Sequence, residues 1–180
     1  MNKIQIAVVL GTAREGRESE KVSSFIQSRL LEHENVSVEA VDVKDHLHGE
    51  TIPAWIEDDR TKKWKNTVER SDAIIFIIPE YNHSYPGEFK ILFDSAFKEY
   101  SKKPIAIVGV SSGGFGGTRV IEEFWHLVMA ASGIPVPTSL NISNVKDSFT
   151  KEASAKDEHI VERTDKMIED VLWYAEKFKI

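Results

Sequence analysis

The amino-acid sequence predicts an α/β fold: a doubly wound, five-stranded parallel sheet with helices on both faces, in one domain of residues 1–180. Two observations lead to this prediction. Five runs rich in valine and isoleucine alternate along the chain with longer stretches in which apolar residues recur at helical spacing. The first run is apolar at nearly every position, which is typical of a central strand covered on both faces.

Each predicted strand is a short apolar run between polar segments. The five runs cover residues 4–10, 36–43, 73–78, 105–110 and 134–142. Pro135 and Pro137 lie in the last run. Because proline cannot donate to a strand ladder, we expect this strand at an edge of the sheet.

The predicted helices carry apolar residues three and four positions apart. They cover residues 22–30, the second part of 53–70 after a loop, 86–100, 120–131 and 160–178. Gly133 follows the fourth helix and is expected to be its C′ glycine. The polar residues 147–157 are expected to form a mobile surface connection.

Composition excludes several classes of protein. The chain has no cysteine, which excludes disulfides and cysteine-ligated metal sites. A net charge of −6 without clustered lysine and arginine argues against nucleic acid as a partner. No apolar run approaches the ~20 residues of a membrane span, and the amino terminus lacks the pattern of a secretory signal. We therefore expect a cytoplasmic protein with no membrane partner.

Three unusual stretches follow the predicted first, third and fourth strands. They are GTAREGRES at 11–19, PEYNHSYPG at 79–87 and SSGGFGG at 111–117. In doubly wound sheets, ligands bind outside the carboxyl ends of the strands, where the strand order reverses. The three stretches are therefore expected to form one ligand site.

The stretch 11–19 combines hydroxyls, arginine and the start of a helix, which suits a phosphate monoester. It lacks the Gly-Lys-Ser/Thr ending of a nucleotide-triphosphate loop and the glycine spacing of a dinucleotide fingerprint. The alternative is a helix N-cap at Ser19 surrounded by solvated charges. Residues 111–117 allow backbone amides to approach a flat ligand, although such a glycine cluster can also be a mobile turn.

The stretch 79–87 offers aromatic walls at Tyr81 and Tyr85 and a polar edge at Asn82, which suits a planar heterocycle. A general acid–base role for His83 is disfavoured because no partner accompanies it in the sequence. Asp45, His46 and His48 resemble a metal cluster, but a solvated loop is the preferred interpretation because no fourth ligand follows.

Together the three stretches resemble the NADPH-dependent FMN reductases of flavodoxin-like fold, which include bacterial quinone, chromate and azo-dye reductases. The resemblance rests on Gly11-Thr12-Ala13-Arg14, on the pattern from Pro79 to Gly87 and on Ser111 to Gly117, in the family's order. Thr12 stands where the family usually has serine. Ile91 and Leu92 replace the usual Asn-Ala after Lys90, which puts the contacts of that helix in question.

The resemblance implies one flavodoxin-like FMN-binding domain with no metal and no catalytic acid or base. The FMN phosphate would be held by Thr12, Arg14 and Ser19, with Arg17 as a competitor that stands off the family pattern. The isoalloxazine ring would be lined by Pro79, Glu80, Tyr81 and Asn82. Its pyrimidine edge or ribityl chain would meet Ser111, Ser112, Gly113 and Gly114.

The resemblance also implies an NAD(P)H-dependent oxidoreductase. NADPH, or NADH, would pass hydride to bound FMN, and an acceptor such as a quinone, free flavin, azo dye or metal ion would then be reduced. A homodimer or dimer of dimers is expected, with an interface partly built from the apolar residues Phe89, Leu92, Phe93 and Phe97. The alternatives are a flavodoxin-type electron carrier and a non-enzymatic FMN-binding redox sensor.

Overall fold

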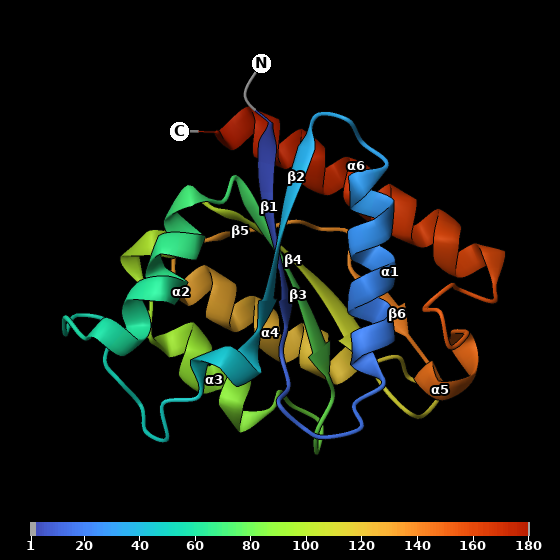
Figure 1. Cartoon of the computed structure of the whole chain (residues 1–180), viewed down its shortest axis with the longest axis horizontal. Helices are drawn as coiled ribbons and strands as arrows, with labels where there is room; N and C mark the ends of the chain where they lie inside the picture. Colours follow the sequence, from blue (N-terminus) through green and yellow to red (C-terminus); the bar gives the residue numbers. More distant parts are fainter. Residues whose placement is uncertain (1–2, 180) are drawn as a thin grey trace.

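A computed structural model describes residues 3–179 of the chain (Figure 1). The strands are β1 (Ile4–Leu10), β2 (Val36–Asp42), β3 (Ala73–Pro79), β4 (Pro104–Val110), β5 (Ile134–Pro135) and β6 (Leu140–Ile142). The helices are α1 (Ser19–Leu31), α2 (Asp59–Arg70), α3 (Gly87–Asp94), α4 (Thr118–Ala130), α5 (Val145–Ser148) and α6 (Glu158–Phe178), with 3-10 helices η1 (Val43–His46) and η2 (Lys98–Tyr100).

All of these strands pair in parallel, in the order β2-β1-β3-β4-β5, with β6 also pairing with β4. The order reverses between β1 and β3, because the chain moves outward from β1 to β2 and then returns to the other side of β1. The switch point of the sheet therefore lies where β1 and β3 end, and this is where the unusual loops begin.

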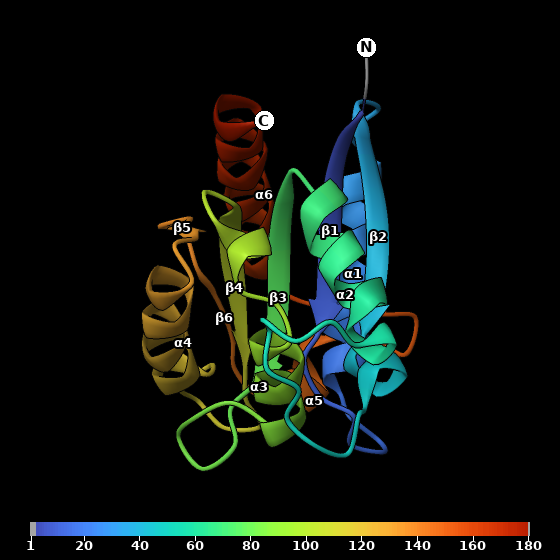
Figure 2. The same ribbon diagram turned by 90° about the vertical axis from the view of Figure 1, so that its left-hand side faces the viewer.

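The sheet is covered on both faces, and its strands alternate between two apolar cores. Ile6, Val8 and Leu10 of β1 pack in the core under α1 and α6. Ala7 and Val9 face the core under α2, α3 and α4. Figure 2, seen from the side of α2 and α3, shows these two helices in front of the strands and α1 and α6 behind them. The doubly wound prediction is confirmed.

The predicted fifth strand is present as two short strands. β5 pairs with the start of β4, and β6 pairs with its end. Pro135 and Pro137 explain the break, since neither residue has an N–H to donate to the ladder. Both strands lie at the β4 edge of the sheet, as expected.

Two predicted helix ends were wrong. The third helix ends at Asp94 rather than near residue 100, because the chain turns there and stacks Tyr100 on Phe93, with ring centroids 4.5 Å apart. The fourth helix ends at Ala130, and its C′ residue with a positive φ of 59° is Ser132 rather than the expected Gly133. Gly133 avoids a tight contact instead, since a Cβ there would lie 3.0 Å from Cδ1 of Ile105.

The connection 147–157 is held to the core rather than being only a polar surface segment. Phe149 is buried, and its ring centroid lies 5.6 Å from that of Phe25. Phe149 also forms an antiparallel bridge with Ala155. Phe149 is the large apolar residue of this segment. Because the residues around it are polar, the sequence pattern did not indicate that it would be buried.

The apolar face of α3 packs against the sheet of its own chain. Phe89, Leu92 and Phe93 are buried, whereas Phe97 is 57% exposed. The expected contribution of the first three residues to a subunit interface is therefore wrong, because they have no free surface to offer. Within residues 3–179, no helix is both long and apolar enough to cross a membrane.

Candidate functional site

A pocket of about 590 Å³ lies at the carboxyl ends of β1, β3 and β4. Eight of the eleven predicted site residues line it: Arg14, Ser19, Pro79, Glu80, Tyr81, Asn82, Ser111 and Ser112. Thr12, Gly113 and Gly114 do not line it. A hollow of about 690 Å³ lies along the outer side of α2 and contains none of the predicted site residues. The smaller pocket is the functional candidate because three separate loops converge on it.

The start of α1 forms one end of this pocket. The helix begins at Ser19, and the preceding residue makes no side-chain cap, so the expected alternative of an N-cap at Ser19 is wrong. The first amides of a helix have no acceptor within the helix. The hydroxyl of Ser19 is buried and has no hydrogen-bond partner in the described part of the chain. This end of the pocket therefore offers unpaired donors to an anion.

Arg17 lines the pocket but is occupied by carboxylates. Its guanidinium donates to Asp42, with one contact of 2.9 Å, to Glu20 at 2.8 Å, and to the carbonyl of Thr12. Burial disfavours its charge, but the hydrogen bonds to Asp42 and Glu20 nevertheless raise the pKa of Arg17. Arg17 thus ties the start of α1 to the end of β2.

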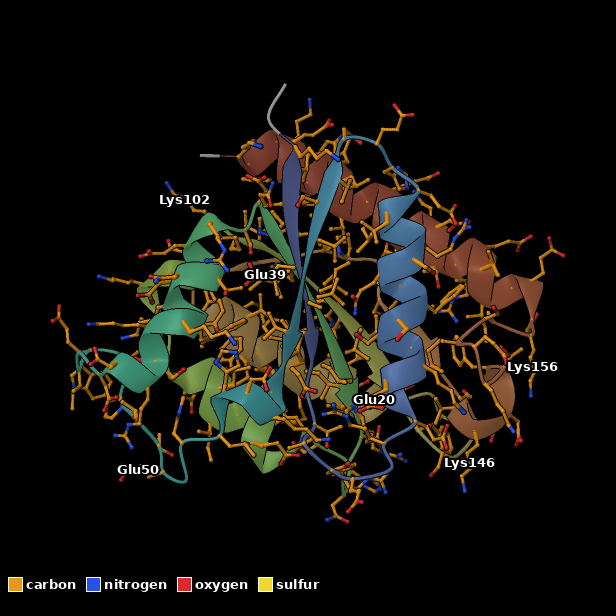
Figure 3. All side chains as sticks on the ribbon, in the orientation of Figure 1. Glu20, Glu39, Glu50, Lys102, Lys146 and Lys156 are labelled. Carbon is orange, nitrogen blue, oxygen red and sulfur yellow. The ribbon has the colours of Figure 1, made fainter. Side chains whose placement is uncertain are left out.

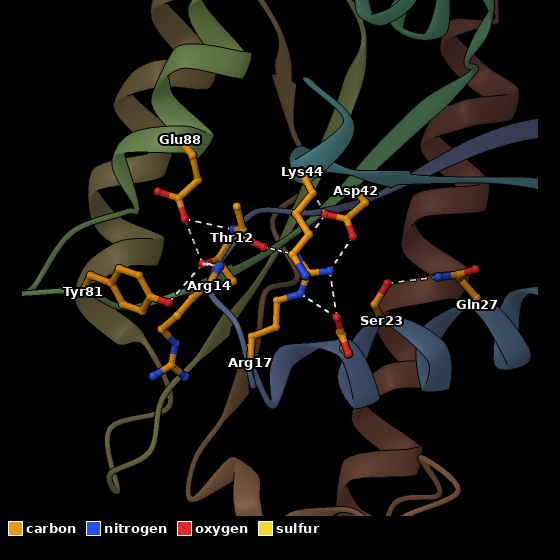
Figure 4. A network of polar contacts seen from close by, with 11 residues as sticks. Thr12, Arg14, Arg17, Ser23, Gln27, Asp42, Lys44, Tyr81 and Glu88 are labelled. Carbon is orange, nitrogen blue, oxygen red and sulfur yellow. Dashed lines mark hydrogen bonds and ion pairs between the residues drawn. The ribbon is translucent and has the colours of Figure 1, made fainter. Parts of the chain in front are cut away.

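Two of the cations that line the pocket have no ion-pair partner among residues 3–179. Arg17 is paired with Asp42, Glu18 with Lys21 at 2.7 Å, and Glu80 with Arg119 at 3.5 Å. Arg14 and Lys146 also line the pocket, and neither makes an ion pair with another residue of 3–179. Figure 4 shows the Arg14 guanidinium pointing away from the Arg17–Asp42 pair. The pocket is therefore locally cationic in a chain of net charge −6.

Thr12 lies behind the pocket wall in a polar network (Figure 4). Its hydroxyl donates to Oε1 of Glu88 at 2.9 Å and lies 3.0 Å from the hydroxyl of Tyr81. The amide of Ala13 donates to the same Glu88 oxygen at 2.9 Å, and the amide of Arg14 donates to the Thr12 hydroxyl at 3.3 Å. One carboxylate thus connects the β1 loop with the loop after β3.

The loop after β3 is a tight antiparallel turn. Tyr81 and Ser84 exchange backbone hydrogen bonds of 2.8 and 3.0 Å. Asn82 and His83, between them, have φ values of 49° and 67°, as the two central residues of a type I′ turn require. Asn82 lines the pocket from this turn. Aromatic and polar groups thus lie on a hydrogen-bonded hairpin beside the pocket.

The glycine loop after β4 is held through its carbonyl groups. The carbonyls of Ser111, Gly113 and Gly114 accept hydrogen bonds from the Val145 amide, the Asn144 amide and the Ser143 hydroxyl, at 3.1, 3.0 and 2.9 Å respectively. The amides of residues 112–114 make no hydrogen bond within residues 3–179. The loop therefore keeps its donors available for a ligand.

Sequence reasoning missed Glu88 and Lys146. Glu88 stands directly after the PEYNHSYPG stretch, in the first turn of α3, where an acidic residue suggests only a favourable helix dipole. Lys146 comes from α5, and no local pattern links it to a loop 130 residues earlier in the chain.

The histidines near residue 46 are not grouped with other potential metal ligands in the described part of the chain. Among residues 3–179, no group of three or more His, Cys, Asp or Glu side chains is arranged to hold a metal ion. The expectation of a solvated loop is nevertheless wrong for His46. It is buried, lies edge-on to Trp64 with ring centroids 6.2 Å apart, and has its pKa lowered by burial.

Comparison with known sequences identifies relatives. The sequence profile of the NADPH-dependent FMN reductases matches residues 4–147, well over half of the chain. A quinone reductase of Pseudomonas putida is 34% identical over 118 residues, which are 62% of each protein. The chain thus spans less than two thirds of this relative. An NAD(P)H-dependent FMN reductase of Saccharomyces cerevisiae is 23% identical over 181 residues, which cover 88% of this chain and 94% of the yeast protein.

Solved structures share the fold. An NAD(P)H:acceptor oxidoreductase of Paracoccus denitrificans, a flavoenzyme, superimposes with a TM-score of 0.79 at 22% identity, covering 97% of this chain and 98% of the other. An archaeal flavodoxin superimposes with a TM-score of 0.63 at 13% identity, covering 98% and 99%. At these identities the superpositions establish the flavodoxin-like fold, which confirms the expected fold class.

Proposed function

We propose that this chain, which belongs to the NADPH-dependent FMN reductase family, binds FMN in the pocket at the carboxyl ends of β1, β3 and β4 and uses NAD(P)H to reduce a small-molecule acceptor. FMN is the family's flavin and NADPH its donor. When bound, FMN supplies the redox chemistry between donor and acceptor. The protein binds, orients and shields it.

The buried, unpartnered hydroxyl of Ser19 is the observation that carries this proposal. Buried polar groups are normally hydrogen-bonded, so an orphan at a pocket wall indicates an absent ligand. Ser19 opens α1, whose first amides also lack acceptors and favour an anion. Arg14, on the same pocket, adds an unpaired cation. These donors fit a phosphate monoester, and we assign the FMN phosphate to this end.

The other end of the pocket suits a flat ring with a polar edge. Pro79 and Tyr81 supply apolar and aromatic surface, and Asn82 supplies an amide. The free amides of residues 112–114 can donate to ring oxygens and stabilise negative charge that develops on them. Of these three residues only Ser112 lines the pocket, so we propose that the amides of Gly113 and Gly114 contribute from behind its wall.

We further propose a quinone or a similar small aromatic molecule as the acceptor, because the Pseudomonas putida relative is a quinone reductase. A relative from a Bacillus species, 26% identical over 149 residues, is an NADPH azoreductase. Free flavin and metal ions complete the range of acceptors to be assayed. A cytoplasmic location remains part of the proposal.

A homodimer is proposed on a different surface from the one expected. Trp55, Ile56 and Phe97 are 86%, 48% and 57% exposed and line the same hollow beside α2. Exposed apolar clusters of this kind favour protein contacts, and a second copy is the partner that we propose. Light scattering at micromolar concentration should give twice the chain mass for wild type and the monomer mass for Trp55→Ser/Phe97→Ser. A monomeric wild type would contradict this assignment.

The function is tested with the purified protein under anaerobic conditions. Bound flavin should give an absorption band near ~450 nm, and NADPH should bleach it rapidly, with recovery on addition of a quinone. A yellow protein that NADPH does not bleach would be an electron carrier or a sensor instead. A protein that binds neither FMN nor riboflavin would contradict the proposal as a whole.

A further inference from the structure

Glu88 joins the two loops that face the flavin pocket. It stands in the first turn of α3, and its side chain is only partly exposed. Its Oε1 atom accepts two hydrogen bonds of 2.9 Å, from the Thr12 hydroxyl and from the Ala13 amide. These donors belong to the loop after β1, whereas Glu88 follows the hairpin after β3.

The hydrogen-bonding capacity of Thr12 is fully used in this arrangement. A threonine hydroxyl has one proton to donate and two lone pairs to accept with. The proton goes to Glu88, which in its ionised form can only accept. The lone pairs are then used by the Tyr81 hydroxyl at 3.0 Å and the Arg14 amide at 3.3 Å. Thr12 therefore has no proton left for a phosphate oxygen.

The position of Thr12 agrees with this conclusion. Thr12 is 0% exposed and does not line the pocket, whereas Arg14 and Ser19 do. Figure 4 shows Glu88 and Tyr81 converging on the Thr12 hydroxyl, with the Arg14 side chain running away from this contact. The Thr12 hydroxyl thus faces the protein, whereas Arg14 and Ser19 face the pocket.

From these contacts, and on the basis of the proposed function, we propose that Glu88 is a positioning residue that locks the phosphate-binding loop and the ring-binding hairpin together through Thr12. The Tyr81 hydroxyl, donating to Thr12, is the third member of this lock. Thr12 acts through Glu88 and Tyr81 and does not contact the phosphate. Loosening the lock should affect both ends of the flavin, since it releases Arg14 on one side and Tyr81 on the other.

Two ligands separate this role from direct phosphate binding. FMN and riboflavin differ in the phosphate, so a lost phosphate contact weakens FMN binding alone. We expect Thr12→Val, which keeps the shape of the side chain, to weaken both ligands by about three- to tenfold. Quenching of flavin fluorescence measures both affinities. If Thr12→Val weakens FMN and leaves riboflavin unchanged, Thr12 is a phosphate ligand and the inference is wrong.

Variants of Glu88 test the lock from its other side. Glu88→Ala should weaken both flavins by a similar factor, and Glu88→Gln, which keeps an acceptor oxygen, should recover most of the affinity. The matched control is Glu158→Ala, which removes an exposed first-turn carboxylate from α6 and should change neither affinity. If Glu88→Ala binds FMN as tightly as wild type or more tightly, Glu88 does not hold the loop, and the inference fails.

A double-mutant cycle supplies a readout that a general loss of stability would not produce. Tyr81→Phe should weaken flavin binding in wild type and have little further effect in Glu88→Ala, because the lock is already open. The visible circular dichroism of bound flavin should change alike in the two single variants. Additive effects would overturn the inference. If wild type binds no flavin at all, the proposed function fails first and the inference with it.

Discussion

The loop after β1 and the glycine loop after β4 serve the same pocket but are held in opposite ways. The β1 loop is fixed by charged side chains, through Arg17 with Asp42 and through Glu88. The glycine loop is fixed through its backbone, by the amides of Asn144 and Val145. We therefore expect substitutions that remove charge to affect the loop after β1, and substitutions that add side-chain atoms to affect the glycine loop. The predictions below test this contrast, beginning with the largest effect.

Adding one methyl group at Gly117 should have the largest effect. Gly117 has a φ of 74°, and a Cβ there would lie 2.7 Å from the Val110 amide nitrogen. We expect Gly117→Ala to lower the free energy of unfolding by about 3 kcal/mol, from backbone strain and overpacking together. Urea denaturation measures this change. Gly113→Ala is the control, since nothing lies within 4 Å of its Cβ and stability should barely change. If Gly117→Ala and Gly113→Ala lowered the free energy of unfolding equally, close packing would not be what fixes the glycine loop.

Removing the charge of Arg17 should destabilise the fold through the β1 loop. Arg17→Met leaves Asp42 without its partner, and we expect a loss of about 2 kcal/mol in the free energy of unfolding. The value is modest because Asp42 keeps contact with water. Burial raises the pKa of Asp42, but hydrogen bonds, chiefly those from Arg17, outweigh it and the pKa is lowered. The stabilisation from the Arg17–Asp42 pair is therefore fully present at pH values above the ordinary carboxyl pKa. It should disappear as the pH falls through the lowered pKa, and the stabilities of the two proteins should then converge.

Arg14→Ala should separate ligand binding from stability in the same loop. Arg14 is exposed and makes no ion pair within residues 3–179, so the free energy of unfolding should stay unchanged. Loss of a charge-assisted bond to the phosphate should weaken FMN by about tenfold, and riboflavin should bind as before. Titration of both flavins against Arg14→Ala and Arg17→Met gives the comparison. An equal loss for both flavins in Arg14→Ala would show that Arg14 does not contact the phosphate.

Lys146→Gln should give the smallest effect. Lys146 lines the pocket from α5, and as an exposed cation it should contribute about a threefold factor to FMN affinity, decreasing with added salt. Figure 3 labels it beside Lys156, which lies further out on the same side of the molecule. Lys156 does not line the pocket, so Lys156→Gln is the control for a change in net charge. If Lys146→Gln and Lys156→Gln changed the FMN affinity equally, the effect would be due to net charge alone.

Much of the fold was predictable because the central strands are unambiguous. β1 and β3 are nearly continuous apolar runs, and their lengths leave little choice except buried strands. The loops that follow them were predictable for the same reason, since parallel strands bring their carboxyl ends to one edge. Eight of the eleven predicted residues accordingly line one pocket.

The rest depended on contacts between distant segments. The role of Thr12 is decided by which neighbour accepts its proton, and that neighbour is 76 residues away. Phe149 is buried because it meets Phe25 of α1, although the residues around it are polar. Pattern and propensity describe local structure, and these pairings are set by tertiary packing.

The hydrogen bonds from Asn144 and Val145 to the glycine loop also order events during protein synthesis. The amino-terminal part of a chain leaves the ribosome first, so β1, β3 and β4 emerge before the segment that shapes the loop between β4 and α4. A nascent chain that ends before residue 143 has the loop after β1 but lacks the donors that hold the glycine carbonyls. The glycine loop therefore gains these donors only late in translation, after about four fifths of the polypeptide has been made.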